Sequence, residues 1–269
     1  MQKGTPEYEQ ALGVAAPCGS PLDVDGCPRA APHSDHGESA KVNLIPAGTA
    51  VPDHGAVLGQ AIPFDRDRWL ARLPSADWWP PELDDCPTVA GRRRVDRSVV
   101  FGIAERADSL EGRRHLLTAA LIWGTGTKAQ SVARRARIFS KSSPRDIDEH
   151  LEAALGILRE KGAVAAYYAF NNKHRIRFLG PAFFTKVLYF AGHEQPTGAW
   201  RPLILDRFVA LALRAAGTGD KWPTSGWKTP CYGRYLSLVH EHARREGVLP
   251  DQIEAALFAH GKQLVRRPR

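Results

Sequence analysis

The helical spacing of apolar residues in the second half of the chain constrains its fold most. From about residue 110 onward, apolar residues recur every three or four positions, and glycine or proline ends each run. The clearest runs are Leu116, Leu117, Ala120, Leu121 and Trp123; Ile147, Leu151, Leu155 and Leu158; and Phe184, Val187, Leu188 and Ala191. Only the stretch from Arg97 to Ile103 has strand character. The pattern predicts an all-α domain.

The first 60 residues differ from the rest in composition and charge. They are rich in Gly, Ala, Pro, Asp and Ser, and they contain 3 Lys and Arg residues against 7 Asp and Glu residues. A segment without an apolar period cannot bury enough surface to offset its chain entropy. We therefore expect a disordered, low-complexity tail over residues 1–60 and a helical domain over residues 61–269.

The predicted domain is strongly basic. Residues 61–269 contain 34 Lys and Arg residues against 22 Asp and Glu residues. Such an excess attracts polyanions, and nucleic acid is the commonest one that is soluble. An anionic membrane is the weaker alternative, because no Lys-rich amphipathic stretch with an exposed apolar face stands out. Two arginine clusters are candidate phosphate contacts: Arg92, Arg93, Arg94 and Arg97, and Arg134, Arg135, Arg137 and Lys141.

Neither cysteine nor histidine spacing indicates a metal. Cys18, Cys27, Cys86 and Cys231 are scattered along the chain, so we expect no disulfide framework, zinc knuckle or iron–sulfur cluster. The run from His240 to His242 lacks the i, i+4 pair of histidines found in zinc helices. We expect a cytoplasmic, nucleoid-associated monomer without a metal or other cofactor.

A predicted helical hairpin over residues 173–192 carries the most informative motif. Gly180 and Pro181 form a tight turn between two helical segments, and basic residues stand just upstream of it at Lys173, Arg175 and Arg177. The N-terminus of the second helix, from Gly180 to Ala182, offers unpaired N–H groups and a partial positive charge. These residues are suited to hold a DNA backbone without reading any base.

Lys186 lies on the second helix of this hairpin. At 100° per residue it points roughly 200° away from Phe184 and the apolar stripe. A lysine in such a position is most often a solvated surface residue. Asp206 lies twenty residues further on, before an apolar run from Arg207 to Ala216, where a helix N-cap is the plain structural interpretation.

The run Leu-Gly-Pro-Ala-Phe-Phe-Thr-Lys-Val-Leu, followed by Leu203-Ile204-Leu205-Asp206, resembles the hairpin and aspartate of the helix-hairpin-helix DNA glycosylases. It is most similar to the 8-oxoguanine DNA glycosylases, over residues 110–264. The resemblance implies the helix-hairpin-helix DNA glycosylase fold, with Lys186 as nucleophile and Asp206 as its electrostatic partner. One departure is that the common hairpin has Gly, an apolar residue and Gly shortly before the lysine, whereas only Gly180 is present here.

The resemblance also implies an activity and a substrate. We expect a bifunctional DNA glycosylase and AP lyase of base excision repair. It flips an oxidised or otherwise modified purine, with 8-oxoguanine favoured, out of double-stranded DNA and excises it through a lysine Schiff base. Two alternatives stay open. The chain is a non-catalytic helix-hairpin-helix DNA-binding protein, or it is a glycosylase that acts on modified bases of phage DNA.

Aromatic residues in two further segments are candidates for binding the flipped base. Trp222, Trp227 and Tyr232 lie in a stretch that mixes aromatic and polar residues, a composition suited to stacking, with core packing as the alternative. Trp123 and Gly124 are candidates for the pocket wall, although a glycine stop of the preceding helix explains Gly124 equally well.

Overall fold

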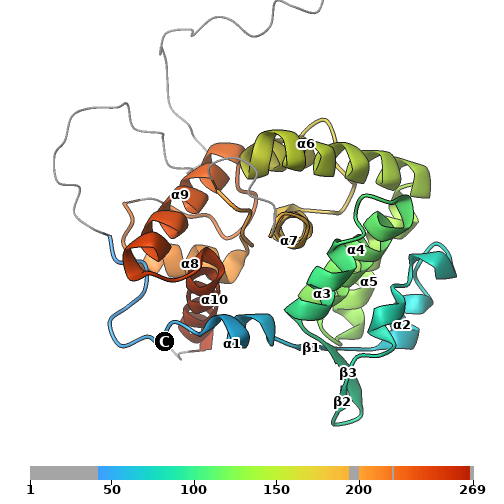
Figure 1. The fold of residues 1–269 in the computed structure, drawn as a ribbon, viewed down its shortest axis with the longest axis horizontal. Coiled ribbons are helices and arrows are strands. Elements are labelled where there is room, and N and C mark those ends of the chain that lie inside the picture. Colours follow the sequence, from blue (N-terminus) through green and yellow to red (C-terminus); the bar gives the residue numbers. More distant parts are fainter. Residues whose placement is uncertain (1–41, 194–199, 220, 267–269) are drawn as a thin grey trace, which may run out of the picture.

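The computed structural model describes residues 42–193, 200–219 and 221–266. This part of the chain is mostly helical, which confirms the prediction of an all-α fold. Figure 1 shows two groups of helices on either side of a central one. The first group contains α2 (Arg66–Leu70), α3 (Arg97–Ala104), α4 (Leu110–Thr125) and α5 (Ala129–Lys141), and the second contains α8 (Arg207–Ala215), α9 (Thr229–Glu246) and α10 (Pro250–Arg266).

The central helix is α7 (Pro181–Ala191), which Figure 1 shows almost end-on. Pro181 suits the first helical position because its missing N–H has no acceptor there. Every residue from 183 to 190 is buried, and the helix packs against α3, α4 and α6 (Pro144–Asn171). A helix buried on all sides must belong to the core. Lys186, on this helix, therefore lies in the interior of the molecule.

Helix α6 is broken at Gly162, just after the apolar run that ends at Leu158. Gly162 has φ +80° and ψ −176°, so the chain leaves the helical region there before the second segment begins. This backbone conformation is readily available only to glycine. The two segments therefore follow the sequence pattern of two helices joined at one residue.

A small sheet lies beside the first group of helices. It contains β1 (Ile62–Phe64), β2 (Thr88–Val89) and β3 (Arg92–Val95) in the antiparallel order β1-β3-β2, with Ile62 opposite Val95. The expected strand character of residues 97–103 is wrong, because this stretch forms α3. The Asp96 side chain caps that helix by accepting a hydrogen bond from the N–H of Val99 at 3.0 Å, and Val100 and Ile103 face the core.

The folded domain begins earlier than residue 61. Residues 1–41 lie outside the described residues, but residues 42–60 pack onto the helices. Leu44, Ile45 and Val57 are buried, and α1 (His54–Leu58) begins at the Asp53 cap. The few apolar residues of this segment bury against a surface that the rest of the chain supplies, which a local pattern does not reveal. In the described part of the chain, no helix is both long and apolar enough to cross a membrane.

Candidate active site

A cavity of about 250 Å³ lies where the two helix groups meet α7. Its walls combine aromatic rings with a few polar and charged groups, as in pockets for small organic ligands. Six elements and three connecting segments supply them: Gln60, Ile62, Arg97, Trp123, Gly124, Thr125, Gly126, Lys186, Ile204, Asp206, Phe208, Glu254 and Phe258. The predicted pair of Lys186 and Asp206 therefore lines one cavity.

Lys186 is a buried amine rather than a surface charge. Its side chain is 5% exposed, and its Nζ donates a hydrogen bond to the carbonyl oxygen of Ala182 at 2.8 Å. Burial lowers the pKa of Lys186, while the Asp206 and Glu254 carboxylates act in the opposite direction without reversing the shift. A lowered pKa increases the fraction of neutral amine at physiological pH. Only the neutral amine is a nucleophile.

Gly124, at the end of α4, provides the space that Lys186 occupies. A Cβ atom at this position would lie 2.8 Å from Cδ of Lys186 and 2.8 Å from Cε1 of Phe183. Both distances are shorter than van der Waals contact allows. The helix itself continues to Thr125 and ends at Gly126, so Gly124 is needed for the lysine rather than for the helix stop.

Asp206 combines the two roles that its sequence position suggests. It is the N-cap of α8, where its Oδ1 accepts hydrogen bonds from the N–H groups of Phe208 and Val209 at 2.9 and 3.1 Å. Its Oδ2 has no hydrogen-bond partner among the described residues. The cap fixes the carboxylate at the cavity wall and leaves one oxygen for a ligand.

The polar wall opposite these residues was not predicted from the sequence. Arg97 is 1% exposed and donates hydrogen bonds to Gln60, Tyr189 and Glu254, with a 2.9 Å contact to Oε2 of Glu254. The expectation that Arg97 contacts phosphate is therefore wrong, because a buried guanidinium paired with a carboxylate cannot reach a backbone. The sequence contains no pattern that predicts the pairing of Arg97 with Glu254, since the two residues are far apart in the chain.

The candidate base-binding aromatics fall into two sets. Trp123 lines the cavity and donates a hydrogen bond from its indole N–H to the carbonyl oxygen of Gln60 at 3.1 Å. Trp222, Trp227 and Tyr232 do not line it. They are at most 2% exposed, and their polar atoms bond to Thr218, Pro223 and Leu203, respectively. For these three residues the structure agrees with the core-packing alternative.

The predicted DNA-binding residues lie together around the turn before α7. Lys173, Arg175 and Arg177 are exposed, and the turn leads through Gly180 and Pro181 into the first helical turn at Ala182. Gly180 has φ −85°, and a Cβ there would meet nothing within 4 Å. The backbone at Gly180 is therefore one that any residue can adopt. The absence of a side chain instead leaves open space outside the N-terminus of α7.

Phe178 takes the left-handed position in this turn, with φ +67°. Such a backbone conformation is rare for a residue with a side chain. Two guanidinium groups cover its ring, Arg137 at 4.1 Å and Arg177 at 5.5 Å from the ring centroid. The turn before α7 thus contains an aromatic residue in a left-handed conformation, held by two arginines.

The remaining arginines of the two predicted clusters have mixed surroundings. Arg93 and Arg94 donate hydrogen bonds to backbone carbonyl groups of Cys86 and Ala61, while Arg92 and Arg134 are exposed. Arg135 lies over the Phe183 ring at 4.0 Å, beside the lysine cavity. Arg92 and Arg134 remain candidates for phosphate contact.

The fold and the cavity define a helical protein built around a buried lysine that shares a pocket with a carboxylate. The chain belongs to the OGG family, whose model is described as "Putative 8-oxoguanine DNA glycosylase OGG-like protein" and matches residues 55–258. The resemblance inferred from the hairpin and the aspartate is thereby confirmed. No curated protein and no solved structure shows significant similarity to the chain. The match begins within α1, in agreement with a domain that starts before residue 61.

Proposed function

We propose that this protein is a bifunctional DNA glycosylase and AP lyase that excises an oxidised purine, 8-oxoguanine above others. The observation that carries the proposal is the burial of the Lys186 amine in a cavity that the Asp206 carboxylate also lines. Membership of the OGG family supports the choice of base. The enzyme needs no cofactor for these steps, which use an amine and a carboxylate alone.

The damaged nucleotide has to leave the duplex before it can react. Flipping costs a few kcal/mol, which contacts to the DNA backbone must offset. The exposed residues Lys173, Arg175 and Arg177 and the open helix N-terminus at Gly180 are suited to those contacts. The rings of Trp123, Phe208 and Phe258 then supply apolar surface for the base.

Cleavage of the glycosidic bond builds positive charge on the sugar. The electron pair of the bond leaves with the base, and the sugar becomes oxocarbenium-like in the transition state. A fixed carboxylate next to that charge lowers the barrier because it needs no reorganisation. The capped Asp206 is the group suited to this role.

The neutral Lys186 amine then adds to the anomeric carbon. The nitrogen forms a bond to C1′ and loses a proton, and opening of the sugar ring leaves a Schiff base between the enzyme and the DNA. Loss of a C2′ proton from this intermediate eliminates the 3′ phosphate and cuts the strand.

Borohydride trapping tests the proposal, because borohydride reduces a Schiff base to a stable amine. We expect the protein to release 8-oxoguanine from a duplex oligonucleotide and to form a covalent adduct with it. Lys186→Gln should bind the same duplex but form no adduct. Lys161→Gln, at an exposed lysine of α6, is the matched control and should trap like the unchanged protein.

Two results decide against the proposal. If the unchanged protein binds duplexes but neither releases a base nor forms an adduct with any oxidised purine, it is a DNA-binding protein without this chemistry. If trapping is efficient only with bases typical of phage DNA, the chemistry stands and the proposed substrate is wrong.

A further inference from the structure

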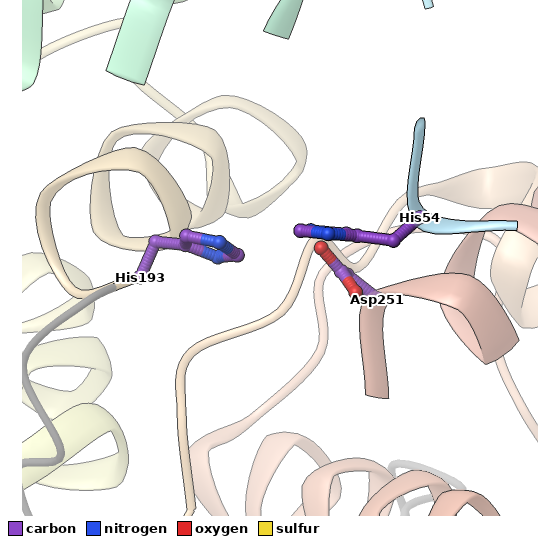
Figure 2. A group of neighbouring side chains, drawn as sticks. All are labelled: His54, His193 and Asp251. Carbon is purple, nitrogen blue, oxygen red and sulfur yellow. The ribbon is translucent and has the colours of Figure 1, made fainter. Parts of the chain in front are cut away.

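A second group of polar side chains converges outside the lysine cavity. His54 at the start of α1, His193 just after α7 and Asp251 in the first turn of α10 each offer one ligand atom, and these atoms all lie within 4.8 Å of one another. Figure 2 shows the ring of His193 directed toward that of His54, with the Asp251 carboxylate beside the latter. Three elements that are distant in the sequence thus present two imidazoles and a carboxylate to one point.

Asp251 lacks the partners that a buried carboxylate requires. It is 3% exposed, and its Oδ2 accepts a hydrogen bond from the Tyr189 hydroxyl at 3.1 Å. Its buried Oδ1 has no hydrogen-bond partner among the described residues. Burial of a charged group is costly unless a counter-charge or a full set of hydrogen bonds accompanies it. Asp251 therefore has one buried oxygen that is available to a ligand.

The histidines are also arranged as ligands are. The Nε2 atom of His54 is buried and has no hydrogen-bond partner among the described residues. The ring of His193 stacks on Phe101, with the centroids 4.2 Å apart and an interplanar angle of 29°. Metal ligands are generally held by such neighbouring contacts, as Tyr189 also holds the Asp251 carboxylate.

We propose that His54, His193 and Asp251 bind a divalent transition-metal ion of the zinc type. Two imidazole nitrogens and a carboxylate oxygen suit Zn²⁺, with the fourth position left for water. Bonds of about 2.0–2.2 Å in a tetrahedron place ligand atoms roughly 3.3 Å apart. In the structure, the three ligand atoms lie within 4.8 Å of one another. Sequence spacing predicts no metal here, because only the fold brings the three residues together.

The position of the site indicates what the metal does. Tyr189, which holds Asp251, also accepts a hydrogen bond from Arg97 at 2.8 Å, and Arg97 pairs with Glu254 at the wall of the lysine cavity. The ion ties α1, α7 and α10 together. It thereby fixes Gln60, which follows α1 and accepts hydrogen bonds from Arg97. The bound ion therefore positions one wall of the cavity.

Metal titration of the full chain, produced without a histidine tag, tests the site. The protein is stripped with a chelator and then titrated with Zn²⁺ in competition with a chromogenic chelator. We expect about one tight equivalent and a rise in Tm of several degrees. Co²⁺ in place of Zn²⁺ should give visible d–d absorption bands from imidazole and carboxylate ligation.

Variants assign the bound ion to these residues. His54→Gln and, independently, His193→Ala should lose the tight equivalent and the rise in Tm while keeping their helical circular dichroism. His150→Ala is the matched control, because His150 pairs with His174 at 5.8 Å without a third ligand in the described ranges. All three variants retain Cys18 and Cys27, so binding to those thiols stays the same in every titration.

The proposal is overturned if the stripped protein binds less than about 0.2 equivalents tightly, or if His54→Gln and His193→Ala bind as much as the unchanged chain. It is also overturned if His150→Ala loses the ion as they do. Metal stoichiometry and Tm do not depend on a reaction with DNA. The metal site and the proposed glycosylase activity are therefore tested independently.

Discussion

The lysine cavity and the loop over residues 221–228 are both rich in aromatic side chains, but the tryptophans of the loop are packed in the core and do not line the cavity. In the cavity, Gly124 leaves room for Lys186, and charged groups share the wall with Trp123. In the loop, the indole N–H of Trp222 donates a hydrogen bond to the Thr218 hydroxyl, and that of Trp227 to the Pro223 carbonyl. Both acceptors lie four residues earlier in the chain. Aromatic residues alone do not mark a binding site. The feature that distinguishes the candidate site from the packed loop is Gly124, which has no side chain and lies next to the buried Lys186.

This comparison leads to opposite expectations for mutations. Changes in the loop remove packed volume and should lower stability without altering the chemistry. Changes in the cavity remove little packing and should lower the reaction rate in a protein that stays folded. A cavity variant that only unfolds, or a loop variant that only loses activity, would reverse the assignment of the two regions.

The largest effect is expected from Trp222→Ala in the loop. The side chain is fully buried, and truncation of a buried tryptophan costs about 3–5 kcal/mol. Denaturant unfolding followed by fluorescence or circular dichroism measures this loss. At a temperature where the variant is folded, base release per folded molecule should match that of the unchanged protein. A drop of more than about tenfold would place Trp222 in the site.

Asp206→Asn should have the next largest effect, on the rate. Asparagine is as good an N-cap as aspartate, so α8 should keep its stability. In the proposed mechanism the variant loses the charge that stabilises the transition state, and comparable single-group losses cost about 10²–10³ in rate. Single-turnover base release measures the change. A rate within threefold of the unchanged protein contradicts the role given to Asp206.

Gly124→Ala should reduce Schiff-base formation by about tenfold or more. The added methyl group displaces Lys186 or the Phe183 ring, and small misplacements of a reacting group are costly. Gly156→Ala is the matched control, because a Cβ there meets nothing within 4 Å in α6. It should trap normally and be slightly more stable, by about 0.5–1 kcal/mol. If Gly124→Ala and Gly156→Ala form the adduct equally well, Gly124 is not needed to position Lys186.

The smallest expected change is the dependence of trapping on pH. Burial lowers the pKa of Lys186, so the amine loses its proton at a lower pH than an ordinary lysine does. The trapping rate should rise with pH and level off once the neutral amine dominates, below the usual lysine range. A rate measured from pH 5 to 10 gives the midpoint. A rise that continues to the highest pH contradicts a lowered pKa.

The sequence predicted the parts of this protein that depend on local spacing. The helical runs, the break at Gly162 and the turn at Gly180 all follow from patterns within a few residues. Lys186 and Asp206 were recognised because they lie at fixed positions relative to that turn. The predicted start of the domain at residue 61 is too late, because residues 42–60 fold only against partners from elsewhere in the chain.

Contacts between distant segments could not be predicted in the same way. Arg97 looked like one more exposed arginine of a basic cluster, and only the fold places Glu254 and Tyr189 against it. The group of His54, His193 and Asp251 has no sequence spacing typical of a metal site for the same reason. Buried charges depend on tertiary partners, and no local pattern records them.

The most direct test of the central claim is to locate the covalent bond to DNA. The adduct from borohydride trapping on an 8-oxoguanine duplex is digested with a protease and a nuclease, and the modified peptide is sequenced by mass spectrometry. The account predicts one modified residue, the Nζ of Lys186. An adduct on any other lysine, or at the N-terminal amine, would contradict it.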